Sequence, residues 1–185
     1  IKDDISQIRA IAAKNPDNQK IADLLADANM QLTEAQSRYQ AAQAAKTELQ
    51  DKNQTTTLAD VTEKLQTISD KTTAADVDRK QADQDLANAK VAAADDLADA
   101  KQQATGAINQ QLDRIDEQIK QIEQDIADLN DLAKQHPDSQ AVKEALADAK
   151  QQLGDAQDAK QTAQDQLQQI GQATTPDAVN NLNDA

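Results

Sequence analysis

Residues 108–133 read INQQLDRIDEQIKQIEQDIADLNDLA. Apolar side chains recur in this stretch at alternating steps of four and three residues, at Ile108, Leu112, Ile115, Ile119, Ile122, Ile126, Leu129 and Ala133. Such alternation keeps one apolar stripe on a single side of a helix and is typical of the seam of a left-handed coiled coil. The stretch therefore predicts a helix over 105–135 that packs lengthwise against other helices.

A proline ends this helix. The residue before a proline is pushed out of the helical region, so His136-Pro137 predicts a turn. A second apolar stripe follows at Val142, Leu146, Ala149, Leu153, Ala156, Ala163, Leu167 and Ile170 and predicts a helix over 138–170. Because only two or three residues separate the two helices, we expect them to form an antiparallel hairpin.

The chain contains an internal repeat. Residues 15–32, NPDNQKIADLLADANMQL, match residues 136–153, HPDSQAVKEALADAKQQL, at a constant offset of 121 positions. By this correspondence Asn15-Pro16 predicts the same turn between a truncated helix over 2–14 and a helix over 17–51. The chain thus holds about one and a half copies of a unit of a kind that normally occurs in arrays.

Between the two hairpins the pattern Thr-Thr-x-x-Asp-Val occurs twice, at 56–61 and at 72–77. Each copy places a threonine that can cap a helix three residues before an aspartate that suits the positive end of the helix. We therefore expect a short helix over 57–70 and a new helix over 73–104, a length that matches its neighbours. Gly106 costs only about 1 kcal/mol relative to alanine, so the helix over 73–104 should continue directly into 105–135.

The predicted fold is all-α, with elongated tandem three-helix coiled-coil repeats that share a continuous helix. The first repeat spans residues 1–104 and the second spans 105–185, where the next helix begins over 176–185.

Composition excludes several classes of function. Alanine, glutamine and aspartate supply 36, 29 and 27 of the 185 residues, and the chain has one histidine and no cysteine, tryptophan or phenylalanine. Zinc fingers, thiol nucleophiles and disulfide frameworks are therefore excluded. A formal net charge of −14 argues against nucleic acid and anionic membranes as partners. We also expect no membrane insertion, because no stretch approaches the roughly 20 apolar residues that a span requires.

Individual residues that invite a functional reading also have simpler structural roles. His136, whose counterpart is Asn15, suits the end of a helix better than a metal or catalytic site. The acidic cluster of Asp76, Asp78, Asp83 and Asp85 lacks the spacing and the glycine of a calcium loop, so we interpret it as a solvated face. The pair Asp95-Asp96 is interpreted in the same way.

Tyr39 stands where the second copy has Lys160, while Lys46 stands where it has Leu167, which indicates compensated packing more than a ligand site. We assign no catalytic, cofactor-binding or metal-binding residue and expect no cofactor.

The repeats resemble spectrin-type three-helix repeats. With their Ala-, Asp-, Gln- and Lys-rich composition they also resemble the helical repeats in the stalks of wall-anchored surface proteins and adhesins of lactic acid bacteria and other Gram-positive bacteria. This resemblance implies an extracellular, cell-wall-anchored location. It also implies a non-enzymatic stalk that projects an adhesive or functional domain from the cell wall, with neighbouring repeats of the same chain as partners.

Two alternatives remain open. In one, the repeats are themselves an adhesin that binds a host glycoprotein, serum protein or matrix protein through aliphatic residues off the apolar stripe, of which the best candidates are Ile11, Leu24, Val77 and Val91. In the other, the chain is an intracellular coiled-coil scaffold. A signal peptide and a C-terminal wall-sorting motif in the parent gene would separate the extracellular readings from the intracellular one.

Overall fold

The computed structural model describes residues 1–50 and 57–183. Within these two ranges the chain forms helices and no strands, which confirms the all-α class. The elements are α1 (Lys2–Ala12), α2 (Gln19–Gln50), α3 (Leu58–Gln135), α4 (Gln140–Gln172) and α5 (Pro176–Asn183). The ranges expected from the sequence for α1, α2, α4 and α5 were 2–14, 17–51, 138–170 and 176–185. Positions 51, 184 and 185 of those ranges lie outside the described residues.

The helices belong to two compact units, Ile1–Asp96 and Leu97–Ala185, and α3 contributes residues to both. These units divide after Asp96, whereas the repeat predicted a division between residues 104 and 105. Leu97 and Ala100 pack against the apolar cluster of the second unit, which includes Ala104 and Ile108. Because these side chains face α4 and α5, the start of the second unit lies earlier along α3 than the repeat suggested.

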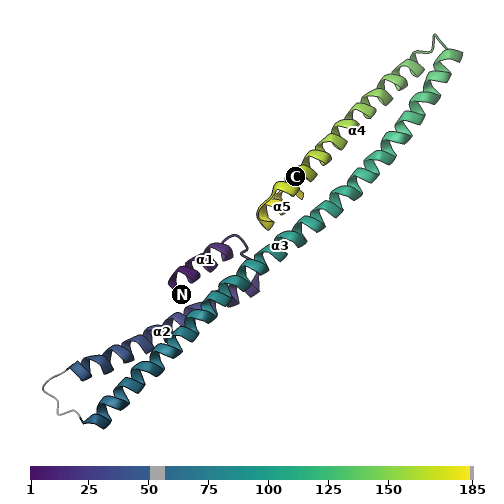
Figure 1. The fold of residues 1–185 in the computed structure, drawn as a ribbon. Coiled ribbons are helices and arrows are strands. Elements are labelled where there is room, and N and C mark those ends of the chain that lie inside the picture. Colours follow the sequence, from purple (N-terminus) through teal and green to yellow (C-terminus); the bar gives the residue numbers. More distant parts are fainter. Residues whose placement is uncertain (51–56, 184–185) are drawn as a thin grey trace. The chain divides into compact units, whose positions relative to one another are not determined.

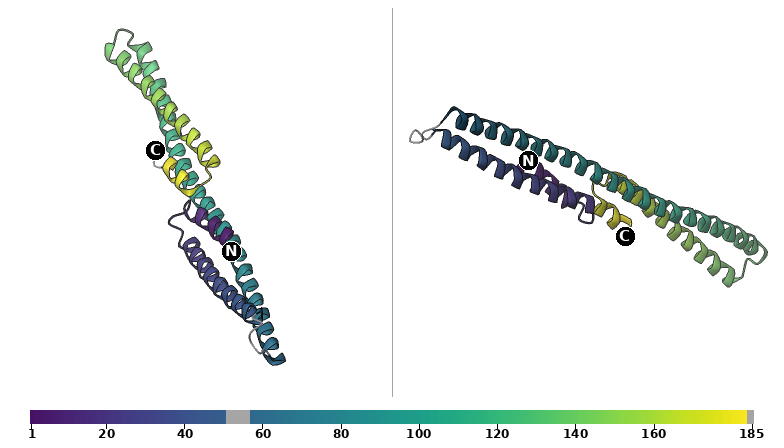
Figure 2. Two further views of the ribbon diagram at one scale, coloured as in Figure 1. Left: turned by 90° about the vertical axis from the view of Figure 1, so that its left-hand side faces the viewer. Right: turned by 90° about the horizontal axis from the view of Figure 1, so that it is seen from below.

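The first unit is an antiparallel α2–α3 hairpin with α1 lying beside it (Figures 1 and 2). Its core joins all three helices and contains Ile5, Ile8, Ile21, Ala28, Leu86, Ala89 and Ala92. Ile8, Ile21, Ala28 and Ala89 are fully buried. Since most α3 residues in this cluster are alanines, the helices meet through small side chains, and α1 is held by its isoleucine stripe.

The second unit consists of the later part of α3, α4 and α5. Its core contains Ala104 and Ile108 from α3, Ala163 and Ile170 from α4, and Val179 from α5. Ile170 and Val179 are almost completely buried, so the short helix α5 is held against the end of α4 by its one large buried side chain. Lys101 of α3 also donates from Nζ to the carbonyl oxygen of Gly171, 2.8 Å away, near the end of α4.

The structure differs from the sequence prediction between the expected helices over 57–70 and 73–104, because α3 runs through this region without a break. The prediction of a new start at Thr73 is wrong. A threonine hydroxyl can donate to the carbonyl four residues earlier instead of capping a helix, and Thr72 does so to Ile68 at 2.8 Å. No glycine or proline lies between Leu58 and Thr105 to interrupt the backbone hydrogen bonds.

Four helices begin at a polar capping residue. The Asn18 Oδ1 accepts from the Ile21 amide at 3.0 Å, and the Ser139 Oγ accepts from the Val142 amide at 3.4 Å. These caps lie at equivalent positions of the repeat, directly after the two X-Pro turns. At the other two starts, Thr57 forms a reciprocal capping box with Asp60, and Thr175 accepts from the Ala178 amide. The helix starts are thus specified by local hydrogen bonds that satisfy otherwise unpaired amides.

Candidate functional sites

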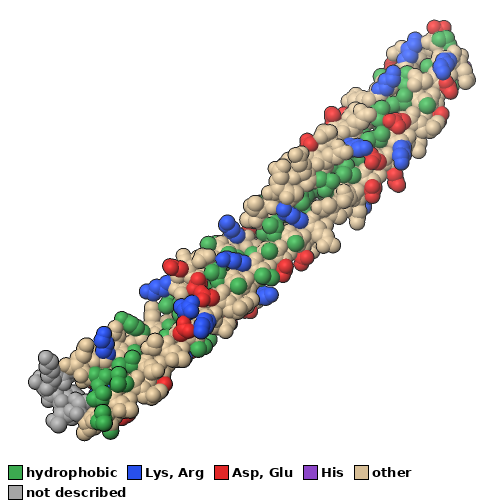
Figure 3. Space-filling view, in the orientation of Figure 1, with side chains coloured by type: hydrophobic (Ala, Val, Ile, Leu, Met, Phe, Trp, Pro, Cys, Tyr) green, Lys and Arg blue, Asp and Glu red, His purple; other side chains and the backbone are tan. Residues whose placement is uncertain are grey.

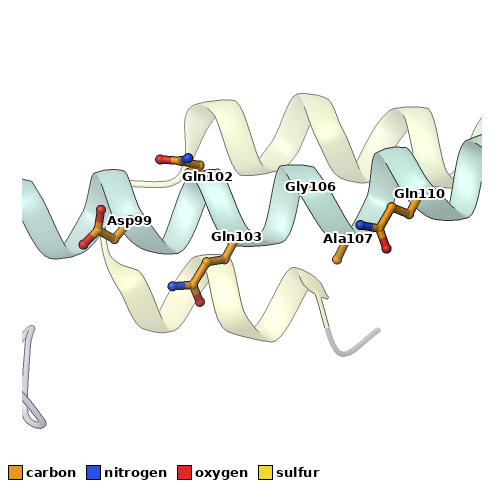
Figure 4. Close-up of a pocket in the computed structure, with 6 residues that line it drawn as sticks. All are labelled: Asp99, Gln102, Gln103, Gly106, Ala107 and Gln110. Atoms are coloured by element: carbon orange, nitrogen blue, oxygen red, sulfur yellow. The ribbon is translucent and has the colours of Figure 1, made fainter.

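One surface hollow lies on α3 and is lined by Asp99, Gln102, Gln103, Gly106, Ala107 and Gln110. All six residues come from a single helix, and Figure 4 shows their side chains spread along it between α4 and α5. Asp99 is the only ionisable side chain in the lining. Because no second acid, base or nucleophile converges on this hollow, it lacks the groups that general acid–base or covalent catalysis requires.

A second hollow lies on α2 and is lined by Ala35, Gln36, Tyr39 and Gln40. Tyr39 is 63% exposed, and its hydroxyl accepts a hydrogen bond from the Gln43 side chain on the same helix. A third hollow on α3 is lined by Asp125, Asp128, Leu129 and Leu132. These lie on single helix surfaces as well, so neither encloses a ligand as a typical small-molecule site does.

The structure does not bring the four aspartates of the acidic cluster together. Asp76 pairs with Arg79 and Lys80, and Asp83 pairs with Arg79, all on the exposed side of α3. Asp78 and Asp85 are buried and face α2. Within residues 1–50 and 57–183, no three His, Cys, Asp or Glu side chains are placed so that they could hold a metal ion.

The buried aspartates instead belong to a polar interface between α2 and α3. The Arg38 guanidinium donates to the Asp78 carboxylate and, at 3.2 Å, to the carbonyl oxygen of Ala74. The Asp85 carboxylate accepts from the Gln31 amide at 2.8 Å. Gln31 and Arg38 are seven residues apart on α2, as are Asp78 and Asp85 on α3, so both contacts obey one antiparallel register. Buried polar contacts of this kind favour that register, because a shifted one would leave them unpaired.

The prediction of a solvated face is wrong for Asp78 and Asp85, because both carboxylates are buried and pair with side chains of α2. The sequence does contain a signal for this interface. The two polar residues on α2 and the two aspartates on α3 are each seven residues apart, and each lies directly before a position of the apolar stripe of its helix.

Hydrogen bonds and ion pairs shift the pKa values of three side chains. The pKa of Arg38 lies above its usual value, chiefly because its guanidinium donates to Asp78. The pKa of Asp76 lies below its usual value because Lys80 and Arg79 donate to its carboxylate. The pKa of Asp60 is lowered as well, since the hydroxyl and the amide of Thr57 both donate to it, at 2.7 and 3.0 Å. All three shifts favour the charged form of the side chain, so none of them moves a pKa toward neutral pH.

The two turn residues, His136 and Asn15, have different environments. His136 is exposed, and its backbone takes part in the turn by donating to Leu132 and accepting from Ser139. Asn15 is buried and donates from its side chain to the carbonyl of Ile11 at 2.9 Å. Asp96, expected on a solvated face, accepts a hydrogen bond from the Asn18 side chain and so ties the first turn to α3. These contacts give the turn residues structural roles.

The aliphatic residues considered for binding fall into two groups. Ile11 and Leu24 are partly buried against the core of the first unit, whereas Val77 and Val91 are 60% and 57% exposed on α3. None of the helices in the described part of the chain is long and apolar enough to cross a bilayer.

No family model, curated protein or solved structure matches this chain.

Proposed function

We propose that this chain is a non-enzymatic spacer. In this proposal it consists of tandem spectrin-like three-helix repeats in the stalk of a wall-anchored surface protein of a Gram-positive bacterium, where they hold an adhesive or otherwise functional domain away from the cell wall. The observation that carries the proposal is α3, a single helix of 78 residues that belongs to both compact units. Consecutive units then share a helix instead of a flexible linker.

A shared helix suits a spacer for a mechanical reason. Bending at the junction would have to break backbone hydrogen bonds of α3, whereas a linker bends by rotating about single bonds. A straight helix of this many residues would measure about 117 Å. The net charge of −14 would keep neighbouring stalks apart at low ionic strength, and salt would screen that repulsion.

The side-chain chemistry also supports a structural role. The surface hollows lie on single helices and lack converging catalytic groups. The buried carboxylates of Asp78 and Asp85 pair with Arg38 and Gln31 of the neighbouring helix, which is a structural use of these charges.

Small-angle X-ray scattering of the chain in moderate salt tests the proposal. A compact domain of this length has a radius of gyration of about 16 Å, whereas a chain with a straight α3 would have a radius of gyration of about 30 Å or more. We expect the larger value. A value near the smaller one would mean that the chain folds back on itself, and the spacer function would have to be abandoned.

The cellular location is tested separately on the parent gene. We expect it to encode a signal peptide before these repeats and a wall-sorting motif after them. An open reading frame without either segment would favour an intracellular scaffold.

A further inference from the structure

Within residues 1–50 and 57–183, three ion pairs join one helix to another. They are Arg38–Asp78 and Glu48–Lys64 between α2 and α3, and Lys160–Asp116 between α4 and α3. In the space-filling view basic and acidic side chains lie next to one another on the first unit (Figure 3). Each pair contributes to the packing of one particular helix on one particular part of α3.

The apolar stripes of α2 and α4 do not distinguish the two copies of the repeat. At the offset of 121 positions, identical stripe residues in the two helices are Leu25, Ala28, Leu32, Ala35 and Ala42, and Leu146, Ala149, Leu153, Ala156 and Ala163. Gln31, which donates to Asp85 of α3, also has an identical counterpart in Gln152. A helix with the sequence of α4 would therefore bring the same apolar residues and the same glutamine to the first part of α3.

The charged residues of the ion pairs, in contrast, differ between the copies. The counterparts of Arg38, Glu48 and Lys160 in the other copy are uncharged: Ala159, Gln169 and Tyr39. All three positions on α2 and α4 that form an ion pair with α3 are thus positions at which the other copy cannot form it. The shared residues give both units the same kind of packing, and the ion pairs are what separates one helix from the other.

Arg38–Asp78 is the pair with the most buried side chain. The Asp78 side chain is 9% exposed and that of Arg38 is 28% exposed, whereas Lys160 and Asp116 are 35% and 43% exposed. A helix with alanine at the position of Arg38 would leave the Asp78 carboxylate buried without a cation. Removing one partner of a buried pair is strongly destabilising, whereas an exposed pair contributes little. Discrimination between the helices therefore depends chiefly on Arg38.

We infer that these ion pairs select which copy of a helix packs on each part of α3, so that the first part of α3 binds α2 and disfavours a helix of the α4 sequence from another copy of the repeat. Ion pairs beside an apolar seam set the choice of partner in coiled coils. A wrong partner is disfavoured by the charge that it leaves unpaired. The inference rests on the proposed function, because a stalk of tandem repeats brings many nearly identical helices close together.

A transplant tests this selection in the intact chain. Residues 29–44 of α2 are replaced by residues 150–165 of α4, which puts alanine at position 38. The matched control carries the same transplant but keeps Arg38. Glu48 lies outside the transplant, so its pair with Lys64 is present in both chains. In urea unfolding followed by circular dichroism, we expect the equilibrium constant of unfolding to be at least about tenfold larger without Arg38 than with it.

Replacing the partner on α3 shows whether the ion pair causes this difference. With Asp78→Ala added to both transplants, Arg38 should change the equilibrium constant of unfolding by less than about threefold, because no buried carboxylate remains for it to pair with. The donation of Arg38 to the carbonyl oxygen of Ala74 does not involve Asp78, so it contributes equally in both backgrounds.

A second comparison uses the natural α2 and does not depend on whether the transplants fold. Arg38→Ala and Met30→Gln each introduce the residue that the other copy has at that position. Met30 is 57% exposed and belongs to no ion pair. Arg38→Ala should raise the equilibrium constant of unfolding at least about tenfold, and Met30→Gln should change it by less than about twofold.

Three results would overturn the inference: equal stability of the two transplants, a difference between them that persists unchanged after Asp78→Ala, or equal effects of Arg38→Ala and Met30→Gln. None of these results bears on the proposed function, which fails independently through a small radius of gyration.

Discussion

Replacing Ala98 by proline tests whether α3 is one helix where the two units meet. Ala98 lies two residues after the boundary between the units, and its side chain is exposed. Proline there removes the amide that bonds to the carbonyl four residues earlier, and its ring clashes with that carbonyl. In a helix interior this costs about 3 kcal/mol or more. No packed side chain is lost, so the whole cost belongs to the backbone.

The matched control is Ala98→Gly, which keeps the amide and introduces no ring. Its cost in a helix interior is about 1 kcal/mol. Urea unfolding followed by far-ultraviolet circular dichroism measures both variants against the natural chain. We expect the proline variant to be at least about 2 kcal/mol less stable than the glycine variant.

The shape of the unfolding curve gives a second readout. Each unit has its own apolar cluster, so interrupting α3 should let the two units unfold in separate transitions. If proline costs no more than glycine and the transition is unchanged, α3 is not a continuous helix at Ala98, and the argument for a shared helix is wrong.

Three further predictions concern single positions. Gly106→Ala should stabilise the chain by about 1 kcal/mol in urea unfolding, because an added Cβ meets no atom within 4 Å; a loss of stability would contradict this. Ala89→Leu should cost about 1–3 kcal/mol, because Ala89 is fully buried, whereas Ala87→Leu, which lies exposed one half-turn away, should change stability by less than about 0.5 kcal/mol; equal effects would refute the assigned packing face. Because the pKa of Asp60 is lowered in the folded chain, its contribution to stability is present above the unfolded pKa of about 4 and is lost as the pH falls through the lower folded pKa. Thr57→Val should raise the pKa of Asp60 in an NMR titration, and an unchanged pKa would show that the capping hydroxyl does not hold the carboxylate.

The parts of the fold that sequence reasoning predicted well are governed by neighbouring residues. The X-Pro turns at Asn15 and His136 separate helices because proline restricts the residue before it. The polar residues that follow those prolines, Asn18 and Ser139, cap the next helices by accepting a hydrogen bond from the amide three residues later. The stripe from Ile108 onward also identified the packed side of α3, since its periodicity follows from helix geometry alone.

The prediction of a new helix at Thr73 failed because the same residues suit both a helix start and a helix interior. Thr73 and Asp76 have the pattern of a helix start, and the same residues are compatible with a helix interior. The contact between Arg38 and Asp78, together with the donation of Arg38 to the carbonyl of Ala74, holds this part of α3 against α2. Because these partners lie about forty residues apart in the sequence, no window around Thr73 contains the contacts that favour the continuous helix.

The helical class, the repeat, the turns and the apolar side of each helix can all be predicted from residue type and spacing, because each depends on residues within a few turns of one another. Which carboxylates are buried and which part of the α2–α3 hairpin α1 covers cannot be predicted in this way. Burial and ion pairing depend on which helices meet and in which register. Asp76 and Asp78 are two residues apart, yet one faces solvent and the other faces Arg38 across the hairpin.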